Sequence, residues 1–120
     1  MLKLLSMPHL LTRISRQENQ GVEESSGEKH SLVATLEKHN SGINALALST
    51  DGSILYSGAC DRSIVVWAKD GADGGMVVLG ALRGHTESIL CLVVVSDLVC
   101  SGSADKTIRV WRRVERNYHV

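Results

Sequence analysis

Two segments of this chain each contain a histidine, a serine, an aspartate and a tryptophan in the same order. These residues are His39, Ser57, Asp61 and Trp67 in the first segment and His85, Ser101, Asp105 and Trp111 in the second. In a hydrolase, an aspartate orients a histidine that takes the proton of a nucleophilic serine. A reaction centre needs such a set once, whereas here the set recurs with its tryptophan. We therefore interpret both sets as structural parts of a repeat and expect no catalytic residues.

The recurrence belongs to a longer internal repeat. SGACDRSIVVW at positions 57–67 aligns with SGSADKTIRVW at positions 101–111, and the two share Ser-Gly, Asp, Ile and Val-Trp. Upstream, LEKHNSGINALAL at positions 36–48 aligns with LRGHTESILCLVV at positions 82–94. The offset is 46 residues upstream (36 to 82) and 44 downstream (57 to 101), so the first copy holds two extra residues near Asp51. A nearly constant period of this size indicates one supersecondary unit per copy.

Each copy is predicted to form short β-strands separated by turns. Short apolar runs bounded by turn residues are typical of strands that are buried on both faces. The predicted strands are 43–49, 55–59 and 64–68 in the first copy and 89–95, 98–102 and 107–112 in the second. A further strand at 76–82 precedes the second copy, and 32–36 is its equivalent before the first. Helical periodicity is absent, so the fold class is all-β.

The period, the four strands and the span from Gly-His to Trp resemble the WD40 repeat of β-propellers. The residues that carry the resemblance are Gly84-His85, Ser101–Asp105 and Ile108–Trp111, with His39, Ser57–Asp61 and Ile64–Trp67 in the first copy. Three positions depart from the family pattern. The Asp that follows Trp in the family is replaced by Ala68 and Arg112, and Lys38 stands where Gly is usual.

The resemblance implies a WD40 β-propeller fragment of about two four-stranded antiparallel blades. It also implies that each histidine set is a buried tetrad, in which Asp holds His and Ser links His to the Trp indole. The segments HSLVATLEKHNSGINALALS and SGSADKTIRVWRR further resemble plant WD40 proteins of the JINGUBANG type. On that resemblance, residues 12–16 end a strand of an earlier blade.

The chain divides into three parts on composition. Residues 31–113 hold the two repeats, with cores at 37–68 and 83–112, and residues 114–120 form a tail. Residues 1–30 are expected to be disordered, because positions 16–30 are polar with Val22 as their one aliphatic residue. In the Leu-rich stretch 1–15, Pro8 and His9 interrupt the apolar run that a secretory signal needs. The stretch has basic but no acidic residues, so an organellar transit peptide is an alternative. We favour a remnant of a longer chain.

Composition excludes several classes of function. Thirteen basic and thirteen acidic residues cancel over 120 positions, so no broad surface attracts nucleic acid or anionic lipid. No apolar run reaches the ~18 residues that cross a bilayer. Three cysteines, Cys60, Cys91 and Cys100, lack a C-x-x-C spacing, which argues against a zinc site and favours a reducing cytoplasmic or nuclear compartment. No phosphate-binding or calcium loop is present, and we expect no cofactor.

A closed propeller takes about four to eight blades. Two blades are too few, so we expect a truncated piece of a larger propeller; the alternative is a short protein that completes itself with other blades or as an oligomer. The expected function is a non-catalytic scaffold for binding other proteins. The alternatives are a Ser/His/Asp hydrolase and a nucleic-acid binder that uses the C-terminal arginines.

Overall fold

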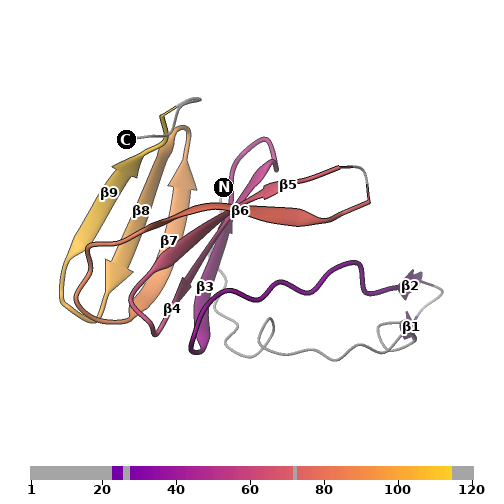
Figure 1. Ribbon diagram of the computed structural model, residues 1–120, viewed down its shortest axis with the longest axis horizontal. Coiled ribbons are helices and arrows are strands. Elements are labelled where there is room, and N and C mark those ends of the chain that lie inside the picture. Colours follow the sequence, from indigo (N-terminus) through magenta and orange to yellow (C-terminus); the bar gives the residue numbers. More distant parts are fainter. Residues whose placement is uncertain (1–22, 26–27, 72, 115–120) are drawn as a thin grey trace.

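The computed structural model describes residues 23–25, 28–71 and 73–114, and in that part of the chain the regular elements are all β-strands (Figure 1). The strands are β1 (Glu23–Ser25), β2 (Glu28–His30), β3 (Ile43–Leu48), β4 (Ile54–Ala59), β5 (Ile64–Lys69), β6 (Met76–Leu82), β7 (Ile89–Val95), β8 (Leu98–Ser103) and β9 (Ile108–Arg112). They form a two-stranded hairpin, a four-stranded sheet and a three-stranded sheet. The prediction of an all-β fold with antiparallel sheets is confirmed.

The four-stranded sheet has the strand order β3-β4-β5-β6 with every pair antiparallel. Its two central strands are largely apolar; β4 is buried along most of its length, whereas β5 is buried in its first half and ends at the exposed Lys69. The turn that leads into β4 is held by the carboxylate of Asp51, which accepts hydrogen bonds from the Ser49 hydroxyl (2.8 Å) and from the backbone N–H of Ser53 (3.0 Å). Gly52 supplies the positive φ that this turn requires (76°).

The three-stranded sheet has the order β7-β8-β9, also antiparallel. A tight turn with Ser96 at a φ of 57° joins β7 to β8. Strand β9 has β8 as its only neighbour among the described residues. Two of its apolar side chains, Ile108 and Val110, are exposed, with 74% and 60% of their surface accessible to solvent.

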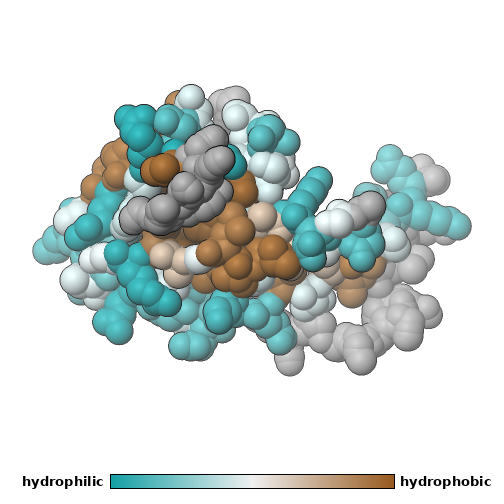
Figure 2. Space-filling view, turned by 45° about the horizontal axis from the view of Figure 1, so that its top comes forward, coloured by the Kyte–Doolittle hydropathy of each residue, from teal (hydrophilic) through white to brown (hydrophobic). Residues whose placement is uncertain are grey.

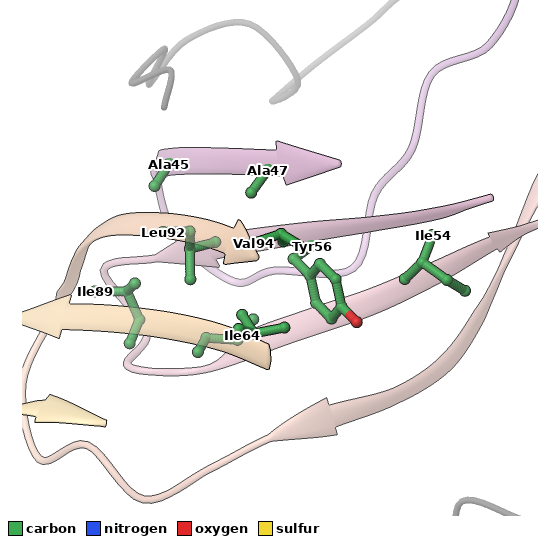
Figure 3. Close-up of a cluster of buried hydrophobic side chains, with 9 residues drawn as sticks. Ala45, Ala47, Ile54, Tyr56, Ile64, Ile89, Leu92 and Val94 are labelled. Atoms are coloured by element: carbon green, nitrogen blue, oxygen red, sulfur yellow. The ribbon is translucent and has the colours of Figure 1, made fainter. Parts of the chain in front are cut away.

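The two larger sheets stack face to face, and the core lies between them. Figure 3 shows Ile54 and Tyr56 of β4, Ile64 of β5 and the β7 residues Leu92 and Val94 gathered in this space. The contact is close because Gly58 lacks a side chain: a Cβ there would lie 2.4 Å from Cγ2 of Ile89. The sheets therefore form one packed unit, joined by apolar side chains.

Most of the predicted strands agree with the structure within one residue at each end. The prediction of a strand at 32–36 is wrong, because residues 31–36 have no sheet neighbour and Leu32 and Val33 are exposed. The predictions for residues 1–15, for the strand end at 12–16 and for the tail beyond 114 lie outside the described residues. Several apolar side chains remain at the surface, and Figure 2 shows a continuous hydrophobic area on one side of the molecule.

Candidate functional site

The first set of four residues is assembled by the β3–β5 part of the larger sheet. His39 precedes β3, Ser57 lies in β4, Asp61 occupies the β4–β5 turn and Trp67 lies in β5. His39 Nδ1 is 3.0 Å from Asp61 Oδ2, and His39 Nε2 is 2.8 Å from Ser57 Oγ. The indole N–H of Trp67 donates to the same serine oxygen over 2.9 Å. The four side chains thus form one continuous hydrogen-bonded chain.

The second set repeats this arrangement in the smaller sheet. His85 Nδ1 is 2.9 Å from Asp105 Oδ2, and His85 Nε2 is 2.8 Å from Ser101 Oγ. The indole N–H of Trp111 donates to Ser101 Oγ over 3.0 Å. The structure therefore brings together, in two separate sites, all eight residues that the sequence singled out.

The donor and acceptor roles follow from the two carboxylates. Since a carboxylate only accepts, the histidine Nδ1 carries the proton that faces it. On the other side of the ring, Nε2 lies next to the serine hydroxyl in both sets, and His39 Nε2 is also 3.1 Å from the Ser57 carbonyl oxygen. A hydrolytic triad has the same order of contacts. Here, however, each serine oxygen also accepts a tryptophan N–H, and Ser57 and Ser101 are 1% and 0% exposed. The serine oxygen is thereby occupied and shielded from an incoming substrate.

Each aspartate also ties a turn to a loop. Asp61 accepts hydrogen bonds from the backbone N–H of Asn40 (3.0 Å) and of Ser63 (3.1 Å). Burial raises the pKa of Asp61, but hydrogen bonds from Ser63, Asn40 and His39 together outweigh it and hold that pKa below its ordinary value. The loop before β3 and the β4–β5 turn are therefore held together by an ionised carboxylate.

Asp105 performs the same task in the second sheet. It accepts hydrogen bonds from the backbone N–H of Thr86 (3.0 Å) and of Thr107 (2.9 Å). The hydrogen bond from the Thr107 hydroxyl is the largest influence on the pKa of Asp105, and with those from His85 and Thr86 it lowers that pKa despite the opposing effect of burial. The turns that carry the two aspartates also share a backbone feature, a positive φ at Arg62 (72°) and at Lys106 (76°).

The two sets differ in how well they are covered. Trp67 is 5% exposed, whereas Trp111 on the edge strand β9 is only half-buried. A groove of about 460 Å³ lies beside the first set and is lined by residues 36–43, Ser57 and Trp67. Ser57 belongs to the lining of this groove, but its hydroxyl stays within the hydrogen-bonded chain.

The remaining candidates do not gather into a site in the part of the chain that the structure describes. Cys60 and Cys91 are exposed, Cys100 is half-buried and all three are free thiols. Arg112 forms an exposed ion pair with Asp97 (2.8 Å). Among residues 23–25, 28–71 and 73–114, no cluster of ligating side chains could hold a metal ion, and no helix is both long and apolar enough to traverse a bilayer.

One contact between the sheets escaped the sequence reasoning. The side-chain amide of Asn44 donates a hydrogen bond to the backbone carbonyl of Ile89 over 2.9 Å, from β3 to β7. The second copy of the repeat has Leu90 at the equivalent position, so the repeat pattern carried no signal for it. This bond adds a polar link between the two sheets to their apolar contact.

Comparison with known proteins agrees with this architecture. The WD40 family, described as "WD domain, G-beta repeat", matches residues 30–68 and 76–112, which is more than half of the chain. The chain belongs to the WD40 repeat family. No solved structure gives a significant match.

Curated relatives are similar over part of their length. Mitochondrial division protein 1 of Schizosaccharomyces pombe is 32% identical over 92 residues, covering 73% of this chain and 14% of the relative. Zinc finger CCCH domain-containing protein 59 of Arabidopsis thaliana is 37% identical over 67 residues, covering 54% of this chain and 14% of the relative. The chain thus spans only about a seventh of the length of these relatives.

Proposed function

We propose that this chain is a non-catalytic scaffold, a piece of a larger WD40 propeller that binds other proteins through one end of its sheets. The observation that carries the proposal is the role of the two aspartates, each of which ties the loop before the first strand of its sheet to the turn before the third strand. We name this end the loop face and define it as residues 37–42, 60–63, 83–88 and 104–107. Loops held on a rigid body are common sites of protein recognition.

Further bonds make the loop face rigid. The backbone N–H of Cys60 donates to the carbonyl of Gly42 (2.9 Å), and that of Ala104 donates to the carbonyl of Ser88 (3.0 Å). Exposed charges of both signs lie on it, including Glu37, Lys38 and Arg83. Such a surface suits a partner protein with a mixed polar surface better than a polyanion, which would favour a single positive sign.

Charge reversal tests this proposal. The chain, alone or within its longer protein, would carry a proximity-labelling enzyme in cells, as wild type and as the Lys38→Glu, Arg83→Glu double variant. The matched control is Lys69→Glu, Arg113→Glu, which makes the same charge change at the opposite end of the sheets. We expect a reproducible set of labelled proteins that the loop-face variant loses and the control keeps. Equal loss in both variants, or loss in neither, would contradict the proposal.

An ester-hydrolysis assay separates the scaffold from the hydrolase. Wild type and the Ser57→Ala and Ser101→Ala variants would be incubated with nitrophenyl esters, and we expect all three to match the buffer rate. Turnover that disappears only in Ser57→Ala would establish the hydrolase instead, because Ser57 borders the groove.

We also propose the finer placement: a plant protein of the JINGUBANG type, acting in the cytoplasm or nucleus. The sequence segments around His39 and Trp111 support it, and the similarity to an Arabidopsis thaliana protein is compatible with it. Reading the full-length transcript through both ends of the frame is the direct test. Further Gly-His to Trp repeats in that frame would support a larger propeller, and stop codons at both ends would refute it.

A further inference from the structure

We propose that Asp70 is a site of spontaneous covalent modification, at which the aspartyl residue isomerises to isoaspartate through a cyclic imide with Gly71. The site lies in the loop between β5 and β6, at the tip of a hairpin that points away from the β7–β9 sheet (Figure 1). We name residues 70–75 the hairpin loop. This reaction belongs to the chain itself and is independent of any partner that the scaffold binds.

The reaction needs only these two residues and water. The backbone nitrogen of Gly71 attacks Cγ of the protonated Asp70 carboxyl group, so that a C–N bond forms, a C–O bond breaks and one water leaves. Water then adds back to the imide. Opening at Cγ restores aspartate, whereas opening at the main-chain carbonyl leaves the chain running through the side chain, with a free α-carboxylate. Glycine favours the attack because it has no side chain to hinder it.

The chain contains three Asp-Gly pairs, and the glycine of each pair has a positive φ. The pairs are Asp51-Gly52, Asp70-Gly71 and Asp73-Gly74, and the φ values of their glycines are 76°, 84° and 91°. The pairs thus share both the local sequence and the sign of the backbone angle. Their surroundings therefore decide which of them reacts.

The pair in the β3–β4 turn is protected at both reacting groups. Asp51 Oδ1 accepts hydrogen bonds from the backbone N–H of Ser53 (3.0 Å) and from the hydroxyl groups of Ser53 (2.7 Å) and Ser49 (2.8 Å). These bonds lower the pKa of Asp51, which disfavours the protonated carboxyl that must lose water. The N–H of Gly52, whose nitrogen would attack, donates to the carbonyl of Ser49 over 2.9 Å.

The first pair of the hairpin loop lacks this protection. Asp70 and Gly71 are exposed, and among the described residues neither the Asp70 carboxylate nor the Gly71 N–H has a hydrogen-bond partner. Beyond the chain neighbours of Gly71, the described atom nearest to a Cβ at that position would be Asp73 Oδ1, 3.8 Å away. The backbone N–H of Asp70 donates to the carbonyl of Gly75 (2.8 Å), which closes the loop without using either reacting group.

The second pair of the hairpin loop is intermediate. Asp73 Oδ1 accepts a hydrogen bond from the backbone N–H of Gly75 over 3.1 Å. Gly74 is half-buried, and a Cβ there would lie 2.4 Å from Cγ1 of Val33. We therefore expect this pair to react more slowly than the first pair of the hairpin loop and faster than the pair in the β3–β4 turn.

Ageing of the full chain tests the proposal. Wild type is kept for several weeks in mildly acidic buffer, once folded and once in guanidinium chloride. Chymotryptic peptides, in which cleavage after Tyr56 separates Asp51 from Asp70, are then fragmented by electron transfer to distinguish isoaspartate from aspartate. In the folded chain we expect isoaspartate to form at least about tenfold faster at Asp70, because several hydrogen bonds must break before Asp51 can react. In guanidinium chloride the two rates should converge.

Enzymatic methylation is an independent measurement. An isoaspartate-specific methyltransferase transfers a methyl group from S-adenosylmethionine to the free α-carboxylate. We expect aged wild type to accept the label and aged Asp70→Glu, whose longer side chain disfavours ring closure, to lose most of it. The matched control is Asp97→Glu, which makes the same change at an exposed aspartate that precedes a leucine and should keep the label.

Four results would each overturn the proposal. They are isoaspartate that is absent from position 70 of the folded chain, equal rates at positions 51 and 70 in the folded chain, a difference between these rates that persists in guanidinium chloride, and methylation that Asp70→Glu leaves unchanged.

Discussion

The two stacked sheets are copies of one unit, yet they stand in different surroundings. Each sheet has one face covered by the other and one open face, but the β3–β6 sheet has its outer strand β6, whereas β9 has no second neighbour among the described residues. Equivalent residues therefore experience different burial: Ile64 is 0% exposed, and its counterpart Ile108 is 74% exposed. The comparison shows that the repeated sequence specifies the strands of each sheet. The burial of a residue, and with it the residue's contribution to the stability of the fold, depends on what packs against its sheet.

Truncation of a leucine gives the largest expected contrast. Leu92 is completely buried between the sheets, and its counterpart Leu46 is only half-buried on the open face of the first sheet. We expect Leu92→Ala to lower the free energy of unfolding by about 2–5 kcal/mol, through lost apolar burial and the cavity that remains. Leu46→Ala should cost less than half as much. Urea unfolding followed by tryptophan fluorescence measures both losses.

A glycine pair comes next in size. Gly58→Ala would place a methyl group 2.4 Å from Ile89 Cγ2 in the packed interface, and we expect a loss of about 1–3 kcal/mol. Gly102→Ala, at the equivalent position on the open face, meets the movable Cys91 thiol and should change stability by less than about 0.5 kcal/mol. Thermal unfolding of the two variants in parallel is the measurement. Equal losses would show that local strand geometry, and not the contact between sheets, decides the need for glycine.

The apolar runs and the repeat were enough to predict strands β3 to β9 and to locate the eight residues of the two hydrogen-bonded chains, but they did not predict β1 and β2. The features that the sequence analysis missed depend on contacts between segments that are far apart in the sequence. Residues 32–36 have the pattern of a strand, but a strand needs an edge to pair with, and none is available to them in the structure. The bond from Asn44 to Ile89 was equally hidden, because it joins two copies and occurs once. A sequence repeat therefore identifies the contacts that recur in every copy. A contact that is made only once, between the two copies, can be found only from the structure.

Alanine variants of Ser57 and Ser101 compare how much the two hydrogen-bonded chains contribute to stability. Removing the Ser57 hydroxyl leaves the N–H of the buried Trp67 without its partner and takes from His39 Nε2 one of its two contacts, the other being the Ser57 carbonyl oxygen. We expect this loss to cost about 1–3 kcal/mol. Ser101→Ala should cost less, about 1 kcal/mol, because the half-buried Trp111 can reach water. Urea unfolding measures the difference, and Ser41→Ala, which changes an exposed serine, serves as control. If both serine variants match that control, the hydrogen-bonded chains do not stabilise the fold.

Acid titration probes the smallest effect, the charge on Asp61 and Asp105. Both pKa values lie below the ordinary 3.8, so the carboxylates stabilise the folded chain fully above about pH 4, and this contribution disappears as the pH falls through the lowered pKa values. The double variant Asp61→Asn, Asp105→Asn should therefore be less stable than wild type at pH 7 and approach it below pH 3. The exposed Asp70→Asn should follow wild type throughout. A gap between wild type and the double variant that stays constant from pH 7 to pH 2 would show that amide geometry, and not charge, makes the difference. The single variants Asp61→Asn and Asp105→Asn then assign the contribution of the charge to each sheet.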